Sequence, residues 1–273
     1  MGNAHPTFLR GIFMNLKKLL AEFLLVCFVF CFSSFAFAAK DKDLIFYMSF
    51  DKMVAGKVQD DSGNENVGTL TGDAKIVKNG KYGSAVSLGG AGYVDCGNNP
   101  VMNQEFTGLT LEAWAKPEVL SPESTIIGKW AWTAAGDHIG LFMFAGKGLV
   151  AIADGVTSEQ GFSGKIVVNE KEWVHVAATW DSKDFSHQIF INGELDSTGK
   201  QTGKGINTKS AETLKIGAQI TGTARYFTGL IDDVAIYSKV LTEDEIKRDM
   251  QSLAPVEYSG KLANTWGGTK SVY

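Results

Sequence analysis

The sequence predicts an all-β sandwich that ends with one short helix. Two observations support this fold class. Short apolar segments separated by glycine-containing turns recur along the chain, and only one segment, near residue 245, has a helical pattern. The eleven candidate strands are residues 44–50, 85–88, 93–96, 109–117, 125–129, 138–144, 149–153, 173–180, 188–191, 213–217 and 229–237.

Two of these segments show in which layer they belong. Residues 111–115 alternate in character along the strand, whereas residues 173–180 carry apolar or aromatic side chains on both faces. The second segment is therefore expected to be a central strand that is covered on both sides. Asn192 and Gly193 both accept a positive φ, so they predict a tight hairpin between a strand ending at Ile191 and one resuming near Leu195.

The helix is expected at residues 243–250. Thr242 precedes it as an N-cap, Glu245 stands at the position that completes a capping box, and Lys247 and Arg248 favour its C-terminal end. Residues 255–273 are polar and contain glycine, so we interpret them as a C-terminal tail and not as a second domain.

The first 38 residues have the pattern of a secretory signal peptide. Lys17 and Lys18 form a basic region, an apolar stretch follows, and Ala36-Phe37-Ala38 is a small-residue cleavage motif. Met14 provides the better start of such a peptide, which makes it the candidate for the true start. Residues 39–254 are then expected to form one domain.

A membrane anchor is the competing interpretation of the same segment. Its uninterrupted apolar core covers only residues 23–32, whereas a membrane-spanning helix needs about 20 residues. We therefore expect a secreted, periplasmic or cell-surface protein with no stable membrane span after cleavage. Cleavage also removes Cys27 and Cys31, so Cys96 remains alone and the domain contains no internal disulfide.

The charge balance disfavours a nucleic-acid partner. The whole chain has 26 basic and 30 acidic residues and a net charge of −4. Removing the three basic residues and one acid of residues 1–38 leaves a net charge of −6. Nucleic-acid binding relies on basic side chains that neutralise phosphates, and this domain has too few of them in excess.

Eight segments, in order, resemble the laminin-G-like, concanavalin A-type jelly-roll superfamily over residues 44–251. They are YMSFD at 47–51, DSGNENVGTL at 61–70, YGSAVSLGG at 82–90, YVD at 93–95, LTLEAW at 109–114, WVHVAATWD at 173–181, ING at 191–193 and GLIDDVAIY at 229–237. The resemblance implies a jelly-roll β-sandwich of two antiparallel sheets with adjacent first and last strands. Members of this superfamily mostly bind glycans or proteins, often with calcium.

A structural Ca²⁺ is the sharpest site prediction. Its candidate ligands are Asp51 after the first strand, Asp61, Asn64 and Asn66 in a polar turn, and Asp232 in the last strand. Hard oxygen ligands suit Ca²⁺, and the resemblance implies ligands at these three places. The alternative is that the polar residues of the turn only hydrogen-bond their own backbone.

Asp232 is preferred to its neighbour because adjacent residues of a regular strand point to opposite faces.

Exposed aromatic side chains are the second site prediction. Trp130, Trp132 and Phe162 fall in or beside loops, and alternation puts Trp130 and Trp132 on one face, where they could stack on a sugar ring. The alternative for these two is ordinary sheet packing. The remaining strand tryptophans, Trp114, Trp173 and Trp180, are expected in the core.

Together these patterns predict an exported, non-catalytic binding module for carbohydrate, with a glycan or polysaccharide as partner. The alternative is a protein-adhesion or cell-surface structural module whose partner is an extracellular protein. A sandwich glycosidase or lyase is the third possibility. It is disfavoured because the Glu-x-Asp-x-x-Glu strand of the related glucanases is absent, as are nucleophile-elbow, zinc and P-loop motifs.

Overall fold

The computed structural model describes residues 41–121, 123–129, 139–144, 164–200, 206–207, 209, 211–219 and 225–251. All of them belong to a compact unit that spans Asp41–Tyr273 and is separate from Met1–Lys40. Among these described residues, no helix is long and apolar enough to cross a bilayer. The predicted strand at 149–153 lies outside the described residues.

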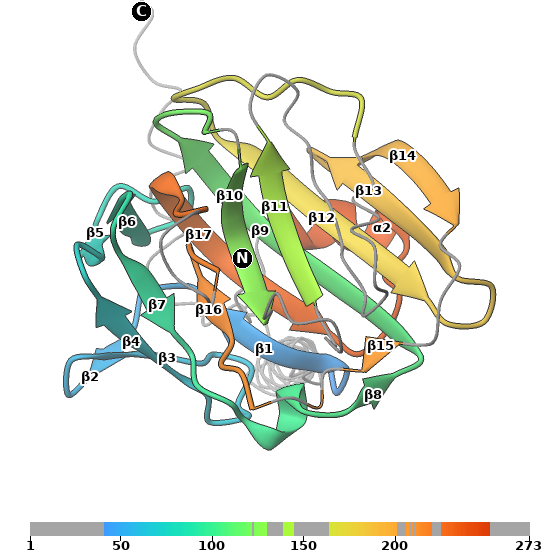
Figure 1. Cartoon of the computed structure of the whole chain (residues 1–273), viewed down its shortest axis with the longest axis horizontal. Helices are drawn as coiled ribbons and strands as arrows, with labels where there is room; N and C mark the ends of the chain where they lie inside the picture. The colour runs from blue at the N-terminus through green and yellow to red at the C-terminus, as the bar shows by residue number, and fades with distance from the viewer. Residues whose placement is uncertain are drawn as a thin grey trace, which may run out of the picture. The chain divides into compact units, whose positions relative to one another are not determined.

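Two antiparallel sheets form the sandwich, which confirms the predicted fold class (Figure 1). The eight-stranded sheet contains, in spatial order, β14 (Glu194–Lys200), β13 (Ser186–Ile191), β12 (Val174–Asp181), β9 (Gly108–Pro117), β17 (Thr228–Tyr237), β6 (Ala85–Gly89) and β5 (Lys75–Val77), with β1 (Leu44–Met48) also paired to β17.

The seven-stranded sheet contains β11 (Ile139–Phe144), β10 (Glu123–Lys129), β16 (Lys215–Ile216), β7 (Tyr93–Asp95), β4 (Val67–Thr71), β3 (Lys57–Gln59) and β2 (Met53–Val54). A third, two-stranded sheet pairs β15 (Ile206–Asn207) with β8 (Glu105–Phe106), and a short 3-10 helix, η1 (Pro100–Met102), precedes β8.

Strand alternation determines where the core lies. In β9, Leu109, Leu111 and Ala113 point between the sheets, whereas Glu112 and Trp114 point to the outer face of the eight-stranded sheet. Every residue of β12 from Val174 to Trp180 is buried, so the prediction of a central strand covered on both sides is confirmed. The hairpin between β13 and β14 is also confirmed, since Asn192 and Gly193 have φ of 52° and 80°.

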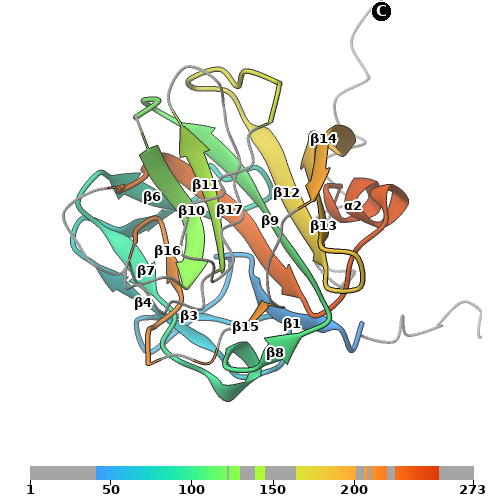
Figure 2. The same cartoon turned by 45° about the vertical axis from the view of Figure 1, so that its right-hand side comes forward.

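The C-terminal helix, α2 (Glu243–Asp249), covers the outer face of the eight-stranded sheet (Figure 2). Thr242 and Glu245 form the predicted capping box, which satisfies backbone donors at the start of the helix. Ile246 is fully buried in a second apolar cluster with Leu44, Tyr47, Ala177, Phe190, Ala235, Tyr237 and Leu241. The sheet is therefore buried on both faces beneath this helix.

The last strand is irregular at its acidic pair. Asp232 lies opposite Trp114 and Ala235 opposite Glu112, so β17 has one extra residue at this point. Asp233 adopts a φ of 46°, in the left-handed region. Asp232 and Asp233 are both buried, and the rule that neighbouring strand residues face opposite sides, used in the sequence analysis, fails here because of this bulge.

Candidate functional site

Two of the predicted calcium ligands contact one turn, at residues 80–84. Asp51 Oδ1 accepts a hydrogen bond from the Ser84 backbone N–H at 2.7 Å. Asp232 Oδ2 accepts one from the Tyr82 backbone N–H at 2.9 Å. Because β1 pairs with β17, a side chain from the start of the domain and one from its end meet at the same loop.

The glycines of this turn allow the two carboxylates to approach its backbone. A Cβ on Gly83 would lie 2.3 Å from Asp51 Oδ1, and a Cβ on Gly80 would lie 2.7 Å from Asp232 Oδ2. Gly83 also has a φ of 78°, which disfavours any other residue. The turn therefore forms a cradle, in which Gly80 and Gly83 leave room for the carboxylate oxygens of Asp232 and Asp51.

The acidic pair of β17 is buried beside this cradle. The Tyr47 hydroxyl donates to Asp233 Oδ1 at 2.5 Å, and the Asp233 backbone N–H donates to Asp232 Oδ1 at 2.8 Å. Burial and the neighbouring Asp233 carboxylate raise the pKa of Asp232 above its usual range. A bound cation would offset this repulsion, since it would neutralise charge that the protein places out of water.

The other three predicted ligands lie in the polar turn at residues 60–66, and their side chains hydrogen-bond partners inside and outside that turn. The Asn64 amide donates to the Ile45 carbonyl at 3.1 Å, and the Asn66 amide donates to Asp60 Oδ2 at 2.5 Å. Asp61 Oδ2 accepts from the Ser49 hydroxyl at 2.7 Å. These side chains tie the turn to β1.

The five predicted ligands thus divide between the 80–84 turn and the 60–66 turn. In the described part of the chain, no three His, Cys, Asp or Glu side chains gather into a group that could hold a metal ion. A Ca²⁺ at the 80–84 turn would therefore also need backbone carbonyl oxygens, which are ordinary ligands for this ion.

The predicted ligand-binding aromatics, Trp130, Trp132 and Phe162, lie outside the described residues. The core prediction is confirmed for Trp114 and Trp180, which are buried. It is wrong for Trp173, which is half-exposed because it precedes the first residue of β12.

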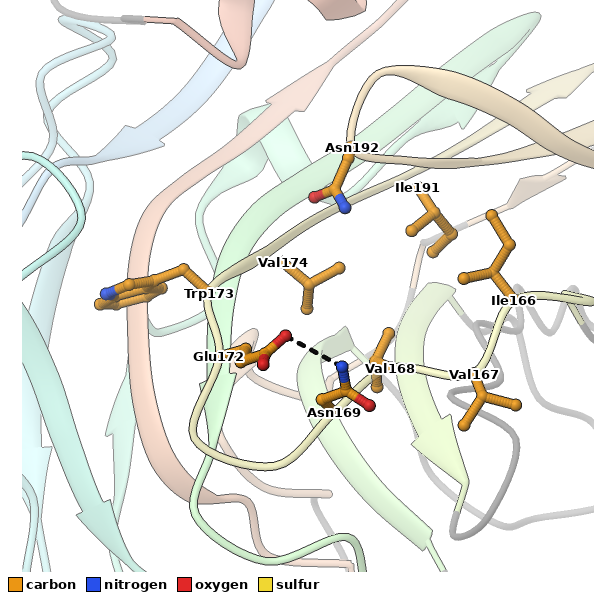
Figure 3. Close-up of a pocket in the computed structure, with 9 residues that line it drawn as sticks. All are labelled: Ile166, Val167, Val168, Asn169, Glu172, Trp173, Val174, Ile191 and Asn192. Atoms are coloured by element: carbon orange, nitrogen blue, oxygen red, sulfur yellow. Dashed lines mark hydrogen bonds between the residues drawn. The ribbon is translucent and has the colours of Figure 1, made fainter.

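A shallow pocket lies where the segment 166–169 meets the start of β12 and the end of β13 (Figure 3). Five of its nine lining residues are aliphatic, and the Asn169 side chain donates to the Glu172 carboxylate at 2.9 Å. Figure 3 shows that the Trp173 ring points away from the other lining side chains. The pocket therefore has no aromatic floor on which a sugar ring could stack.

Two half-exposed tyrosines beside β16, one in β7 and one before β17, were missed by the sequence analysis. The rings of Tyr93 and Tyr226 have centroids 6.5 Å apart and are tilted by 34°. Their positions in the sequence give no sign of this proximity. The one available signal was that Tyr93 alternates with Val94 and so had to face away from the core.

Glu112 and His175 form a buried pair under α2. The distance between His175 Nε2 and Glu112 Oε2 is 3.8 Å, and both residues are almost fully buried. Neither Glu112 oxygen has a hydrogen-bond partner. Burial raises the pKa of Glu112 well above its usual range and lowers that of His175 to about 3, so burial favours the neutral form of each side chain.

Comparison with known proteins gives a family and several relatives. The model of the concanavalin A-like lectin/glucanases superfamily matches residues 88–247. The mouse pentraxin-related protein PTX3 is 26% identical over 158 residues, which cover 55% of this chain and 40% of PTX3. The matched part is thus less than half of that longer protein.

Solved structures share the fold at lower identity. Domain 4 of AbnA, a GH43 extracellular arabinanase from Geobacillus stearothermophilus solved with arabinotriose, has a TM-score of 0.61 and 22% identity, covering 76% of this chain and 98% of that domain. The binding domain of botulinum neurotoxin DC, solved with rat synaptotagmin II, has a TM-score of 0.59 and 18% identity and covers 79% of this chain and 52% of that chain. The same toxin domain was also solved with SialylT, at a TM-score of 0.60.

Proposed function

Since the chain belongs to the concanavalin A-like lectin/glucanases superfamily, we propose that it is an exported, non-catalytic module that binds carbohydrate. The observation that carries the proposal is the match to AbnA domain 4. That domain is covered over 98% of its length and was solved with arabinotriose. A sandwich of this extent is therefore sufficient for sugar binding in that protein, without a further catalytic domain.

The burial of three acidic side chains of the eight-stranded sheet supports a non-catalytic role. Glycoside hydrolysis needs two carboxyl groups roughly 5–10 Å apart that reach the scissile bond. Glu112, Asp232 and Asp233 are all buried. A substrate has no access to them while α2 and the 80–84 turn cover the sheet.

We further propose that a structural Ca²⁺ binds at the 80–84 turn, with Asp51 and Asp232 as its acidic ligands. The cradle of Gly80 and Gly83 and the buried pair Asp232 and Asp233 support this choice. The ion would link the start and the end of the domain through one loop. Its role would be structural, because it would hold together two parts of the chain that are distant in sequence.

A protein-binding role is the second candidate, and one observation favours it. Ile166 and Val167 are 44% and 56% exposed, and they lie side by side at the aliphatic pocket. Exposed aliphatic side chains of this kind suit a protein partner better than a sugar.

The test is a glycan-array screen of the protein without residues 1–38, with millimolar Ca²⁺ or with chelator, and a thermal melt in each buffer. We expect specific glycan binding and a higher melting temperature with Ca²⁺. At 100 times its dissociation constant, an ion stabilises the folded state by about 2.7 kcal/mol, which raises Tm by roughly 5–10 °C in a domain of this size.

Matched variants separate calcium binding from loop stability. Asp51→Asn and Asp232→Asn are expected to abolish the Ca²⁺-dependent shift in Tm. Asp73→Asn should keep it, because Asp73 also binds backbone N–H groups of a turn but contacts Gly89 and Ala91 instead. An unchanged melt of the parent protein would refute the calcium proposal, and a silent array would favour the protein-binding role.

A further inference from the structure

The two tyrosines beside β16 come from distant parts of the chain. Tyr93 lies in β7, and Tyr226 lies in the segment that leads into β17. Both side chains are half-exposed, with ring centroids 6.5 Å apart. Large aromatic rings left partly in water by the fold, rather than packed in its core, are candidates for contact with a ligand.

The backbone fixes both rings on the outer face of the sheet. Val94 and Ile216 are fully buried and paired to each other, so the neighbouring Tyr93 and Lys215 point outwards from adjacent strands (Figure 1). The Phe227 backbone N–H donates to the Gly217 carbonyl at 2.9 Å, which holds the segment of Tyr226 next to β16.

Gly217 cannot be replaced without moving this arrangement. Its φ is 87°, and a Cβ at this position would lie 2.2 Å from Leu88 Cδ1. The backbone at the end of β16 that holds the Tyr226 segment is therefore packed closely against the core at Leu88.

Polar groups of both kinds surround the rings. Lys215 Nζ lies 4.6 Å from the centroid of the Tyr93 ring, and no ion pair involves this ammonium group in the described structure. Asp95 lies opposite Lys215 in the strand pairing, and its Oδ1 accepts from the Gly97 N–H at 2.9 Å. Its other carboxylate oxygen and the exposed hydroxyl of the paired Thr69 can meet a ligand.

We propose that Tyr93 and Tyr226, with Lys215 and Asp95, form a binding platform for neutral sugar rings of a polysaccharide. A sugar ring has an apolar face that packs on aromatic rings and hydroxyls that need both donors and acceptors at its edge. Lys215 and Asp95 carry opposite charges beside Tyr93, which fits a neutral ligand, and the acidic net charge of the chain disfavours a polyanion. This inference rests on the proposed carbohydrate-binding function.

The Lys215 ammonium group lies over the Tyr93 ring, on which the sugar would pack. Its flexible side chain can move to the edge of a bound sugar, where the ammonium donates to hydroxyl oxygens. Binding thus exchanges a contact with the Tyr93 ring for hydrogen bonds to the ligand.

The test is calorimetric titration of the protein, in buffer with millimolar Ca²⁺, with arabinotriose, xylohexaose, cellohexaose, laminarihexaose and an oligogalacturonate. We expect at least one neutral probe to bind, with affinity about tenfold lower for Tyr93→Ala and for Tyr226→Ala. Tyr93→Phe and Tyr226→Phe should stay within about threefold of the parent, because the ring is retained. Trp173→Ala, which removes a half-exposed aromatic elsewhere, should change nothing.

Lys215→Met keeps the side-chain stem on the surface, so it tests the platform even where an alanine variant fails to fold. We expect severalfold weaker binding of the same probe. Binding of a neutral probe that both alanine variants and Lys215→Met retain would overturn this inference and leave the proposed function standing. Binding of the oligogalacturonate alone would overturn the neutral ligand, and binding of no probe, together with a silent array, would overturn both proposals.

Discussion

At the scale of single residues, the buried side chains of Glu112 and His175 make the free energy of unfolding depend on pH. The folded state raises the pKa of Glu112, so folding favours its protonated form. With respect to this group, the free energy of unfolding is greatest below the unfolded pKa of about 4.5 and decreases as pH rises. The folded state lowers the pKa of His175 to about 3, so folding favours its neutral form. With respect to this group, the free energy of unfolding is greatest above about pH 6.5 and decreases as pH falls. The two side chains therefore limit stability from opposite sides.

Glu112→Gln is expected to remove the loss of stability that ionisation of Glu112 causes as pH rises. The glutamine stays neutral at every pH, so the variant should gain stability over the parent as pH rises from 5 to 8, by about 1 kcal/mol or more. Urea unfolding at both pH values measures this difference. Glu118→Gln, a change at an exposed acid that pairs with Lys171, is the control and should show no such trend. An equal effect of Glu112→Gln at both pH values would contradict the assignment.

Local residue patterns account for some contacts and leave others hidden. The capping box of Thr242 and Glu245 and the positive φ of Asn192 depend only on neighbours in sequence, so both could be predicted. The proximity of Tyr93 to Tyr226 depends on the order of strands in a sheet. No pattern within either segment contains that information.

At the scale of elements, the 80–84 turn shows how a loop can be shaped by side chains from two distant strands. Asp51 and Asp232 both accept from its backbone, and Gly83 leaves room for the first of them. The turn therefore connects the end of β1 with the middle of β17, whether or not a cation is present.

A pair of glycine variants separates this contact from backbone strain. Gly56 and Gly83 share a φ of 78°, but a Cβ on Gly56 would meet nothing within 4 Å. Gly56→Ala should cost about 1 kcal/mol of unfolding free energy for the left-handed backbone alone. Gly83→Ala should cost roughly 2 kcal/mol more, because the methyl group collides with the Asp51 carboxylate. Chemical denaturation of both variants measures the difference, and equal losses would show that the carboxylate moves aside freely.

Alternation of apolar residues predicted the strands, but it did not predict the irregularities within them. β9, β12 and β17 were predicted because apolar residues recur at every second position or on both faces. The bulge at Asp232 and Asp233 could not be predicted, since it is defined by the register against β9. The preference for Asp232 over Asp233 therefore rested on a regular strand that the fold does not contain.

At the scale of the whole molecule, export remains a prediction from the first 38 residues. Expression with the native N-terminus should give a secreted or periplasmic protein that begins at Ala39, because cleavage follows the Ala36-Phe37-Ala38 motif. Intact mass and N-terminal sequencing of the exported fraction measure this. Replacing Ala36 and Ala38 by large residues should block cleavage, and a full-length chain that stays in the cytoplasm would refute the prediction.

The pairing of β17 with β1, β6 and β9 has a consequence for the order of folding. β1, β6 and β9 are synthesised early, but each needs β17, residues 228–237, as a pairing partner. The eight-stranded sheet therefore lacks its central strand until late in synthesis. Folds dominated by such distant pairings form slowly. If the chain is exported as its first 38 residues predict, it would stay open during translocation and close its core only when the last strand has emerged.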